Sequence, residues 1–163
     1  MTGAMSGGPV TVSVADFMWF VDRAMDSMVA ILRQLGDERA NQRPALEGAN
    51  SPFAILAHCM GVMEFWAGFM VAGRAIQRDR AAEFEARGKV EDLAQRARTA
   101  RGQLADDIAR LDSASVPPDV LGPEDAGRPY GASHGAVLVH ILEELFQHLG
   151  QMEVTRDVLL AAG

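Results

Sequence analysis

The sequence has almost no cysteine and no excess of positive charge, and each shortage excludes a class of protein. Cys59 is the only cysteine among the 163 residues. An internal disulfide is therefore impossible, which suits a reducing cytosol. Fifteen basic residues stand against 22 acidic ones, for a net charge of −7. Without a basic surface to hold a polyanion, the chain is expected to bind neither nucleic acid nor an anionic membrane.

Long hydrophobic runs and targeting signals are also missing from the sequence. We find no apolar stretch that approaches the roughly 18 residues of a membrane-spanning helix. The opening MTGAMSGGPV has neither the basic start nor the apolar centre of a secretion signal. We therefore expect a cytoplasmic protein with flexible residues 1–12, and its length predicts a single domain over 1–163.

Apolar residues recur at helical spacing in four segments, which predicts an all-α protein. Serines at three segment starts are typical N-caps, and Gly36 is expected to end the first helix. Four amphipathic helices with long connections favour a four-helix bundle. The predicted spans are 14–35, 52–72, 90–111 and 134–160, with caps at Ser13, Ser51 and Ser133.

Two connections between the predicted helices carry features of their own. Residues 74–88, RAIQRDRAAEFEARG, are compatible with a helix end, a turn or a short extra helix. The arginines Arg74, Arg78 and Arg80 fit a solvated charged face better than an anion site. Residues 112–132 are rich in proline and glycine, and a long loop of this kind before the last helix is often a lid or a binding loop.

Polar residues lie on the apolar face of the last predicted helix. At 100° per residue, Glu144 and His148 fall within about 20° of Val137, at the centre of the apolar stripe. A buried carboxylate is costly unless a cation or a proton compensates it. Side chains one turn apart can grip a single metal ion. His58 is the only histidine on the apolar face of the second helix, so it is the candidate third ligand.

Two interpretations of this trio remain open from spacing alone. The first is a divalent metal site of two histidines and one carboxylate, which leaves a coordination position for water or substrate. Zn²⁺ is the first choice, and Ni²⁺ or Fe²⁺ would suit the same ligands. The second interpretation is an ordinary carboxylate–imidazole hydrogen bond beside a satisfied core histidine.

The remaining candidate residues are expected to play lesser parts. We place Gln151 beside the ligands as a supporting residue. His140 either supports the ligands in the same way or is a half-exposed residue at the edge of the stripe. His134 follows the cap residue and is expected to be solvated. Cys59 is expected to be a small buried hydrophobic residue.

Residues 51–66, SPFAILAHCMGVMEFW, and 140–157, HILEELFQHLGQMEVTRD, together resemble the DinB-like superfamily of metal-binding four-helix bundles. The resemblance is closest to the actinobacterial branch related to the N-terminal domain of mycothiol-dependent maleylpyruvate isomerase and to mycothiol S-transferases. It implies that His58, Glu144 and His148 are the metal ligands. It also implies an up-down-down-up helix order, a homodimer, and low-molecular-weight thiols as cosubstrates.

Two features of the resemblance shape the functional expectation. Many relatives have a histidine where Glu144 stands, and the glutamate is the variant of the mycothiol-dependent isomerase. The longer isomerases carry an additional C-terminal domain, so maleylpyruvate is not the expected substrate. Fold similarity does not carry an activity with it.

Three functions follow as hypotheses. The first is a metal-dependent thiol S-transferase, with a small-molecule thiol and an electrophile as partners. The alternative is a non-catalytic, metal-stabilised homodimeric bundle with a stress or binding role. A hydrolase that uses metal-activated water is a weaker third hypothesis, because no inward residue is an obvious general base once Glu144 is a ligand.

Overall fold

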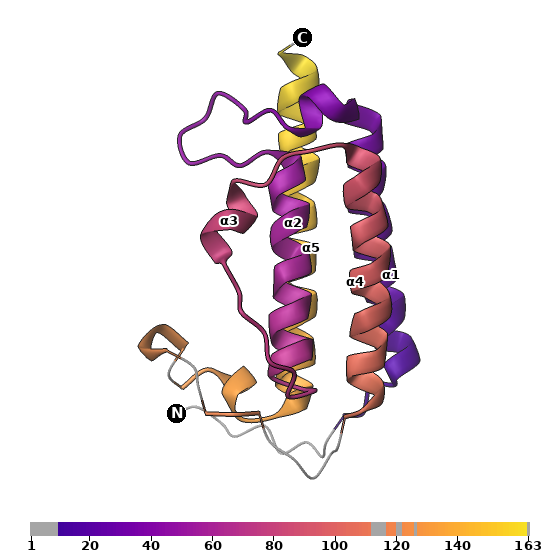
Figure 1. The fold of residues 1–163 in the computed structure, drawn as a ribbon, viewed down its shortest axis with the longest axis vertical. Coiled ribbons are helices and arrows are strands. Elements are labelled where there is room, and N and C mark those ends of the chain that lie inside the picture. The colour runs from indigo at the N-terminus through magenta and orange to yellow at the C-terminus, as the bar shows by residue number, and fades with distance from the viewer. Residues whose placement is uncertain (1–9, 112–116, 120–121, 126, 163) are drawn as a thin grey trace, which may run out of the picture.

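The computed structural model describes residues 10–111, 117–119, 122–125 and 127–162, and over this part of the chain it contains helices and no strand. The expectation of a flexible start falls mostly on residues 1–9, which lie outside the described residues. Four long helices form the bundle, and a short helix and two 3₁₀ turns lie in the connections (Figure 1). The long helices are α1 (Val14–Ala40), α2 (Pro52–Met63, extended by a π-helical turn, η1, at Glu64–Phe69), α4 (Val90–Ala109) and α5 (His134–Ala161); the short elements are α3 (Arg80–Phe84), η2 (Pro123–Asp125) and η3 (Pro129–Gly131).

The order of the long helices is up-down-down-up, so the predicted fold class is confirmed. In Figure 1, α1 and α5 rise, whereas α2 and α4 descend. Helix α1 packs against α5 and α4, and α2 also packs against α5 and α4. Because α2 and α5 are antiparallel neighbours, the middle of one lies against the middle of the other.

Serine caps begin three of the long helices, as the sequence predicts. The hydroxyl oxygens of Ser13, Ser51 and Ser133 each accept a hydrogen bond from the backbone N–H three residues later. Each bond satisfies a donor that the first turn of a helix leaves without a backbone partner. These caps fix where α1, α2 and α5 start.

Gly36 breaks the first helix, as the sequence predicts, but a further helical turn follows it. Gly36 has φ 70° and ψ 173°, a left-handed conformation that glycine adopts at little cost, and the helix resumes beyond this kink to Ala40. The extra turn has a structural role, because Asp37 Oδ1 accepts a hydrogen bond from Val90 N at 2.8 Å. Lys89, at the N-cap of α4, makes no side-chain cap of its own. The start of α4 is therefore capped by α1.

Helix α2 is the central helix of the bundle, with all of its residues buried except Gly61. Residues Pro52–Phe69 are long and apolar enough to cross a membrane by length and composition, so the expectation that no run approaches that length was wrong. However, 78% of this segment is buried inside the molecule. A core helix passes the same test of composition, and burial against α4 and α5 explains why this one is apolar on all sides.

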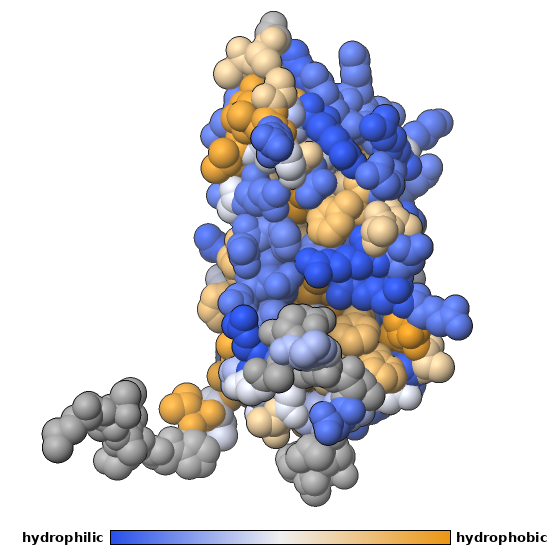
Figure 2. All heavy atoms as spheres, turned by 90° about the vertical axis from the view of Figure 1, so that its left-hand side faces the viewer, coloured by the Kyte–Doolittle hydropathy of each residue, from blue (hydrophilic) through white to orange (hydrophobic). Residues whose placement is uncertain are grey.

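The 74–88 connection contains the short helix α3, which is one of the three predicted options. Asp79 caps it, and none of its residues is buried. Figure 2 shows the face of the molecule that carries α3, where hydrophilic residues form a broad band across the middle. Helix α3 packs mainly against α2 and brings this band next to the central helix.

Candidate metal centre

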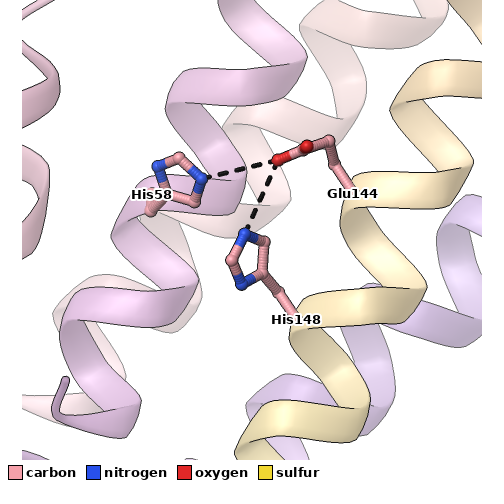
Figure 3. A group of neighbouring side chains, drawn as sticks. All are labelled: His58, Glu144 and His148. Atoms are coloured by element: carbon pink, nitrogen blue, oxygen red, sulfur yellow. Dashed lines mark ion pairs between the residues drawn. The ribbon is translucent and has the colours of Figure 1, made fainter. Parts of the chain in front are cut away.

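The three predicted ligands meet between α2 and α5. His58 projects from α2, and Glu144 and His148 project from successive turns of α5 (Figure 3). Glu144 Oε2 lies 3.6 Å from His58 Nε2 and 3.5 Å from His148 Nε2. One ligand atom from each residue can be chosen so that all three lie within 4.8 Å of one another.

Burial at the trio is uneven and leaves one side accessible. His58 is 1% exposed, whereas the side chains of Glu144 and His148 keep 24% and 17% of their surface. A group of this kind is anchored by the core helix and open toward the surface on the α5 side.

The donor atoms suit a small divalent ion. Ligands about 2.0–2.2 Å from a tetrahedral zinc lie roughly 3.3 Å apart, and the two separations at Glu144 are only a few tenths longer. His58 Nε2 is buried and has no hydrogen-bond partner among the described residues, because Glu144 is slightly too distant. Unpaired buried polar atoms are rare in native proteins, and a metal ion would supply the missing partner. Two imidazoles and a carboxylate fit Zn²⁺, Ni²⁺ or Fe²⁺.

Electrostatics keep the carboxylate ionised and the central histidine basic. The neighbouring imidazoles of His148 and then of His58 hold the pKa of Glu144 well below its usual range despite burial. Burial alone would lower the pKa of His58, but the carboxylates of Glu144 and Glu83 outweigh it and raise that pKa above its ordinary value. The ionised Glu144 therefore supplies the negative charge that a cation needs. A metal ion must compete with a proton for the imidazole of His58.

Sequence reasoning missed Glu83, which holds the other nitrogen of His58. The Nδ1 atom lies 2.8 Å from Glu83 Oε2, and Phe84 stacks on the imidazole with ring centroids 4.5 Å apart. Arg78 was expected on a solvated face, but it donates to both oxygens of Glu83, at 2.8 and 3.0 Å. The one signal for this contact is Gly61, because a glycine inside a helix is costly and often marks a close approach by another group.

Of the two residues that were predicted to support the ligands, Gln151 contacts a ligand and His140 does not. Gln151 Oε1 lies 2.9 Å from His148 Nδ1, which leaves Nε2 of that ring facing Glu144. His140 points elsewhere: its Nδ1 lies 3.0 Å from Glu143 Oε2, and its ring stacks on Tyr130 with centroids 4.2 Å apart. Among the described residues it makes no hydrogen bond to the trio.

Three further predictions about single residues have mixed outcomes. Cys59 is fully buried, and burial raises the pKa of its thiol, so it is the inert hydrophobic residue that was expected. His134 was expected to be solvated but is buried at the start of α5. Arg74 was expected on a solvated face, but it forms a two-pronged ion pair with the buried Asp107 on α4.

A cavity of about 380 Å³ adjoins the trio and has His58 and Glu144 in its wall. Its volume is in the range of small-molecule sites. Trp66 and His140 line it, together with Tyr130 from the connection before α5. Part of the predicted 112–132 loop therefore borders the site, whereas residues 112–116, 120–121 and 126 lie outside the described residues.

Comparison with known proteins agrees with this architecture. No curated protein and no solved structure matches the chain. The model of one family, described as the DinB superfamily, matches residues 21–152, which include all three candidate ligands and most of the bundle. The match covers well over half of the sequence, and the chain belongs to the DinB superfamily.

Proposed function

We propose that the protein binds one divalent metal ion at His58, Glu144 and His148 and uses it as a transferase of low-molecular-weight thiols. The observation that carries the proposal is the buried, unpaired Nε2 of His58, which faces an ionised carboxylate and a second imidazole beside a cavity. Zinc is the metal that the donor set favours. The resemblance to mycothiol S-transferases suggests mycothiol or a similar thiol as the cosubstrate.

Three protein ligands leave a coordination position, and this is the arrangement of catalytic rather than structural zinc. The chemistry that the metal supplies when bound is a lowered thiol pKa, so that a thiolate exists at neutral pH. The thiol proton leaves to solvent. The sulfur then forms a bond to carbon of an electrophile, whose leaving group departs with its electron pair or whose double bond takes up a proton.

The protein's own residues have defined parts in this proposal. His58, Glu144 and His148 hold the ion, and Gln151 fixes the ring of His148 through its Nδ1. The aromatic wall formed by Trp66 and Tyr130 accommodates the body of a substrate and limits access of water. None of these residues has to act as an acid or a base.

Metal content and thiol binding test the proposal together. Purified protein should carry about one divalent ion per chain, and Glu144→Gln and His148→Ala should lower that occupancy strongly. Glu143→Gln is the matched control, because it makes the same charge change at an exposed neighbouring residue of α5. If Glu144→Gln and His148→Ala keep full occupancy, the carboxylate–imidazole hydrogen bond is the better account of the trio.

Thiol binding is measured on protein substituted with Co²⁺. Mycothiol, or another thiol from a cellular panel, should produce a sulfur-to-cobalt absorption band, and the zinc-loaded protein should conjugate it to a generic electrophile faster than the metal-free protein. His58→Ala should abolish the excess rate with the helical circular dichroism unchanged. A metal-loaded protein that gives no band with any thiol would support the non-catalytic bundle instead.

A further inference from the structure

We propose that Glu83 positions His58 for metal binding. We also propose that docking of helix α3, which carries Glu83, on α2 is coupled to metal binding. The proposal rests on the metal centre described above. Neither Glu83 nor α3 belongs to the ligand set. The region contacts the inner side of the His58 ring through Glu83, and Arg78 and Arg80 line the adjoining cavity.

The geometry around Glu83 fixes which nitrogen of His58 is free. Both oxygens of Glu83 accept hydrogen bonds from Arg78, so the carboxylate is an ionised acceptor. The Nδ1–H of His58 donates to Oε2 at 2.8 Å. Because that nitrogen is occupied, the lone pair for a metal must be on Nε2, the atom that faces Glu144. Carboxylates that hold metal-ligating histidines in this way commonly contribute 10–100-fold to metal affinity.

The backbone of α2 is shaped to let the carboxylate approach. A Cβ atom added at Gly61 would collide with Glu83 Oε1, which belongs to a side chain only 12% exposed. Gly61 lies three residues after His58, on the adjoining turn, and it is the one residue of α2 that is not buried. The contact thus depends on the absence of a side chain at Gly61 of α2 and on the ion pair between Arg78 and Glu83.

Helix α3 has few other means of holding its position. None of its five residues is buried, and its contacts with other elements are mainly with α2. Arg43 adds a hydrogen bond to the carbonyl oxygen of Phe84, at 3.0 Å. The ion pair on His58 and the stacking of Phe84 therefore account for much of the docking. If metal binding locks the His58 ring, it must stabilise docked α3, and docked α3 must strengthen metal binding by the same factor.

Metal affinity in matched variants tests the positioning role. Glu83→Gln preserves the size of the side chain but removes the charge that binds Arg78, and Glu85→Gln makes the same change at an exposed residue next to α3. In competition with a chromophoric chelator, Zn²⁺ should bind Glu83→Gln at least tenfold more weakly than wild type, whereas Glu85→Gln should stay within twofold. Gly61→Ala keeps every charge and should give a similar loss, which guards against a folding defect specific to Glu83→Gln.

Two readouts besides affinity distinguish positioning from a general structural role. Wild-type protein should show a slowly exchanging Nδ1 proton on His58 by NMR, and that proton should exchange rapidly in Glu83→Gln. Hydrogen exchange of backbone amides in residues 79–88 should slow when Zn²⁺ is added to wild type and should not respond in Glu83→Gln.

Each negative result would overturn a different part of the proposal. Equal zinc affinity in Glu83→Gln and Glu85→Gln, or a wild-type protein without the protected Nδ1 proton, would overturn the role of Glu83 and leave the metal centre standing. Exchange in residues 79–88 that ignores zinc would overturn the coupling of α3. A wild-type protein that binds neither Zn²⁺ nor Co²⁺ would overturn the metal centre itself, and a loaded protein that binds no thiol would overturn only the transferase.

Discussion

His58 is the residue on which proton and metal compete. Its Nε2 faces Glu144, and its pKa is raised because the carboxylates of Glu144 and Glu83 outweigh the effect of burial. A metal ion needs the neutral imidazole, so protonation of this ring opposes binding. Because Nδ1 of the ring is already held by Glu83, protonation at low pH occurs at Nε2.

Metal affinity should therefore rise with pH through a midpoint above the ordinary histidine value of about 6.5. Below that midpoint, a drop of one pH unit should weaken metal affinity by up to about tenfold for each proton that the metal displaces. Zinc affinities from pH 5.5 to 8.5, in non-coordinating buffers, measure the profile. A midpoint at or below 6.5 would show that Glu144 and Glu83 do not raise the pKa of His58.

In the neutral range, the free energy of unfolding of the metal-free protein should fall as the pH rises, whereas metal affinity should rise. A raised His58 pKa contributes stability that is complete below the unfolded value near 6.5 and is lost as the pH rises through the folded value. The lowered pKa values of Glu144 and Glu83 contribute stability present above about 4.5 and lost as the pH falls through the folded values.

The metal-free protein should thus be most stable between about pH 5 and 6 and should weaken toward pH 8. Urea unfolding at fixed temperature, in the presence of a chelator, measures the free energy at each pH. Replacing Glu144 with Gln should flatten the neutral part of the curve. Constant stability of the wild type between pH 5.5 and 8 would contradict the electrostatic account of the trio.

At the scale of elements, the kinked end of α1 and the start of α4 depend on each other. Asp37 reaches the backbone N–H of Val90, and Asn41 exchanges hydrogen bonds with the backbone of Gly88. We predict that Asp37→Ala will cost about 1 kcal/mol of the free energy of unfolding, the usual effect of losing an N-cap. Asp37→Asn, which keeps a carbonyl acceptor, should cost much less. Chemical denaturation compares the two, and equal losses would show that the cap itself contributes little.

The ion pair between Arg74 and Asp107 joins the connection after η1 to α4. Asp107 is 1% exposed, and removing a partner from a buried charge costs roughly 3–5 kcal/mol. Because the Arg74 side chain is 28% exposed and Gln103 also donates to Asp107 at 3.0 Å, we predict a smaller loss for Arg74→Met, roughly 1–3 kcal/mol. Arg33→Met is the control, because its pair with Glu91 is exposed and screened by solvent and should contribute much less to stability. Similar losses in both variants would contradict the importance of burial here.

Local patterns in the sequence predicted the helices and the trio, but not the contacts between distant segments. Periodic apolar residues and three serine caps are local signals, and they located α2 and α5 well. The turn beyond Gly36 could not be foreseen, because it is stabilised by Val90, more than fifty residues away. The same reason applies to Glu83, whose role depends on α3 folding back onto His58.

Candidate ligands were predictable for a different reason. Glu144 and His148 lie on the face of α5 that otherwise carries core residues, so the angle around the helix singles them out. Spacing alone could not separate a metal site from a hydrogen bond, and the resemblance to a metal-binding family was needed to favour the metal. His134 shows the limit of local reasoning: it follows a cap residue, where exposure is usual, and it is nevertheless buried.

At the scale of the whole molecule, the metal centre and the hydrophobic core are largely independent. Buried apolar side chains from all four long helices form one cluster, and two of the three ligands are partly exposed at its edge. The core is extensive enough to hold the bundle without a ligand, as expected for a domain of this length. Bound metal should then add stability by mass action rather than create the fold.

Removing the metal with a chelator should therefore leave the helical circular dichroism nearly unchanged at 25 °C. It should lower the free energy of unfolding by an amount set by the affinity, about 2.7 kcal/mol when the free metal had been one hundred times its Kd. Thermal melts of the loaded and chelated protein, at several zinc concentrations, measure this difference, and His148→Ala should lose the dependence on zinc. Unfolding on chelation would instead show that the ion is structural, as in small zinc domains, and would favour the non-catalytic bundle over the transferase.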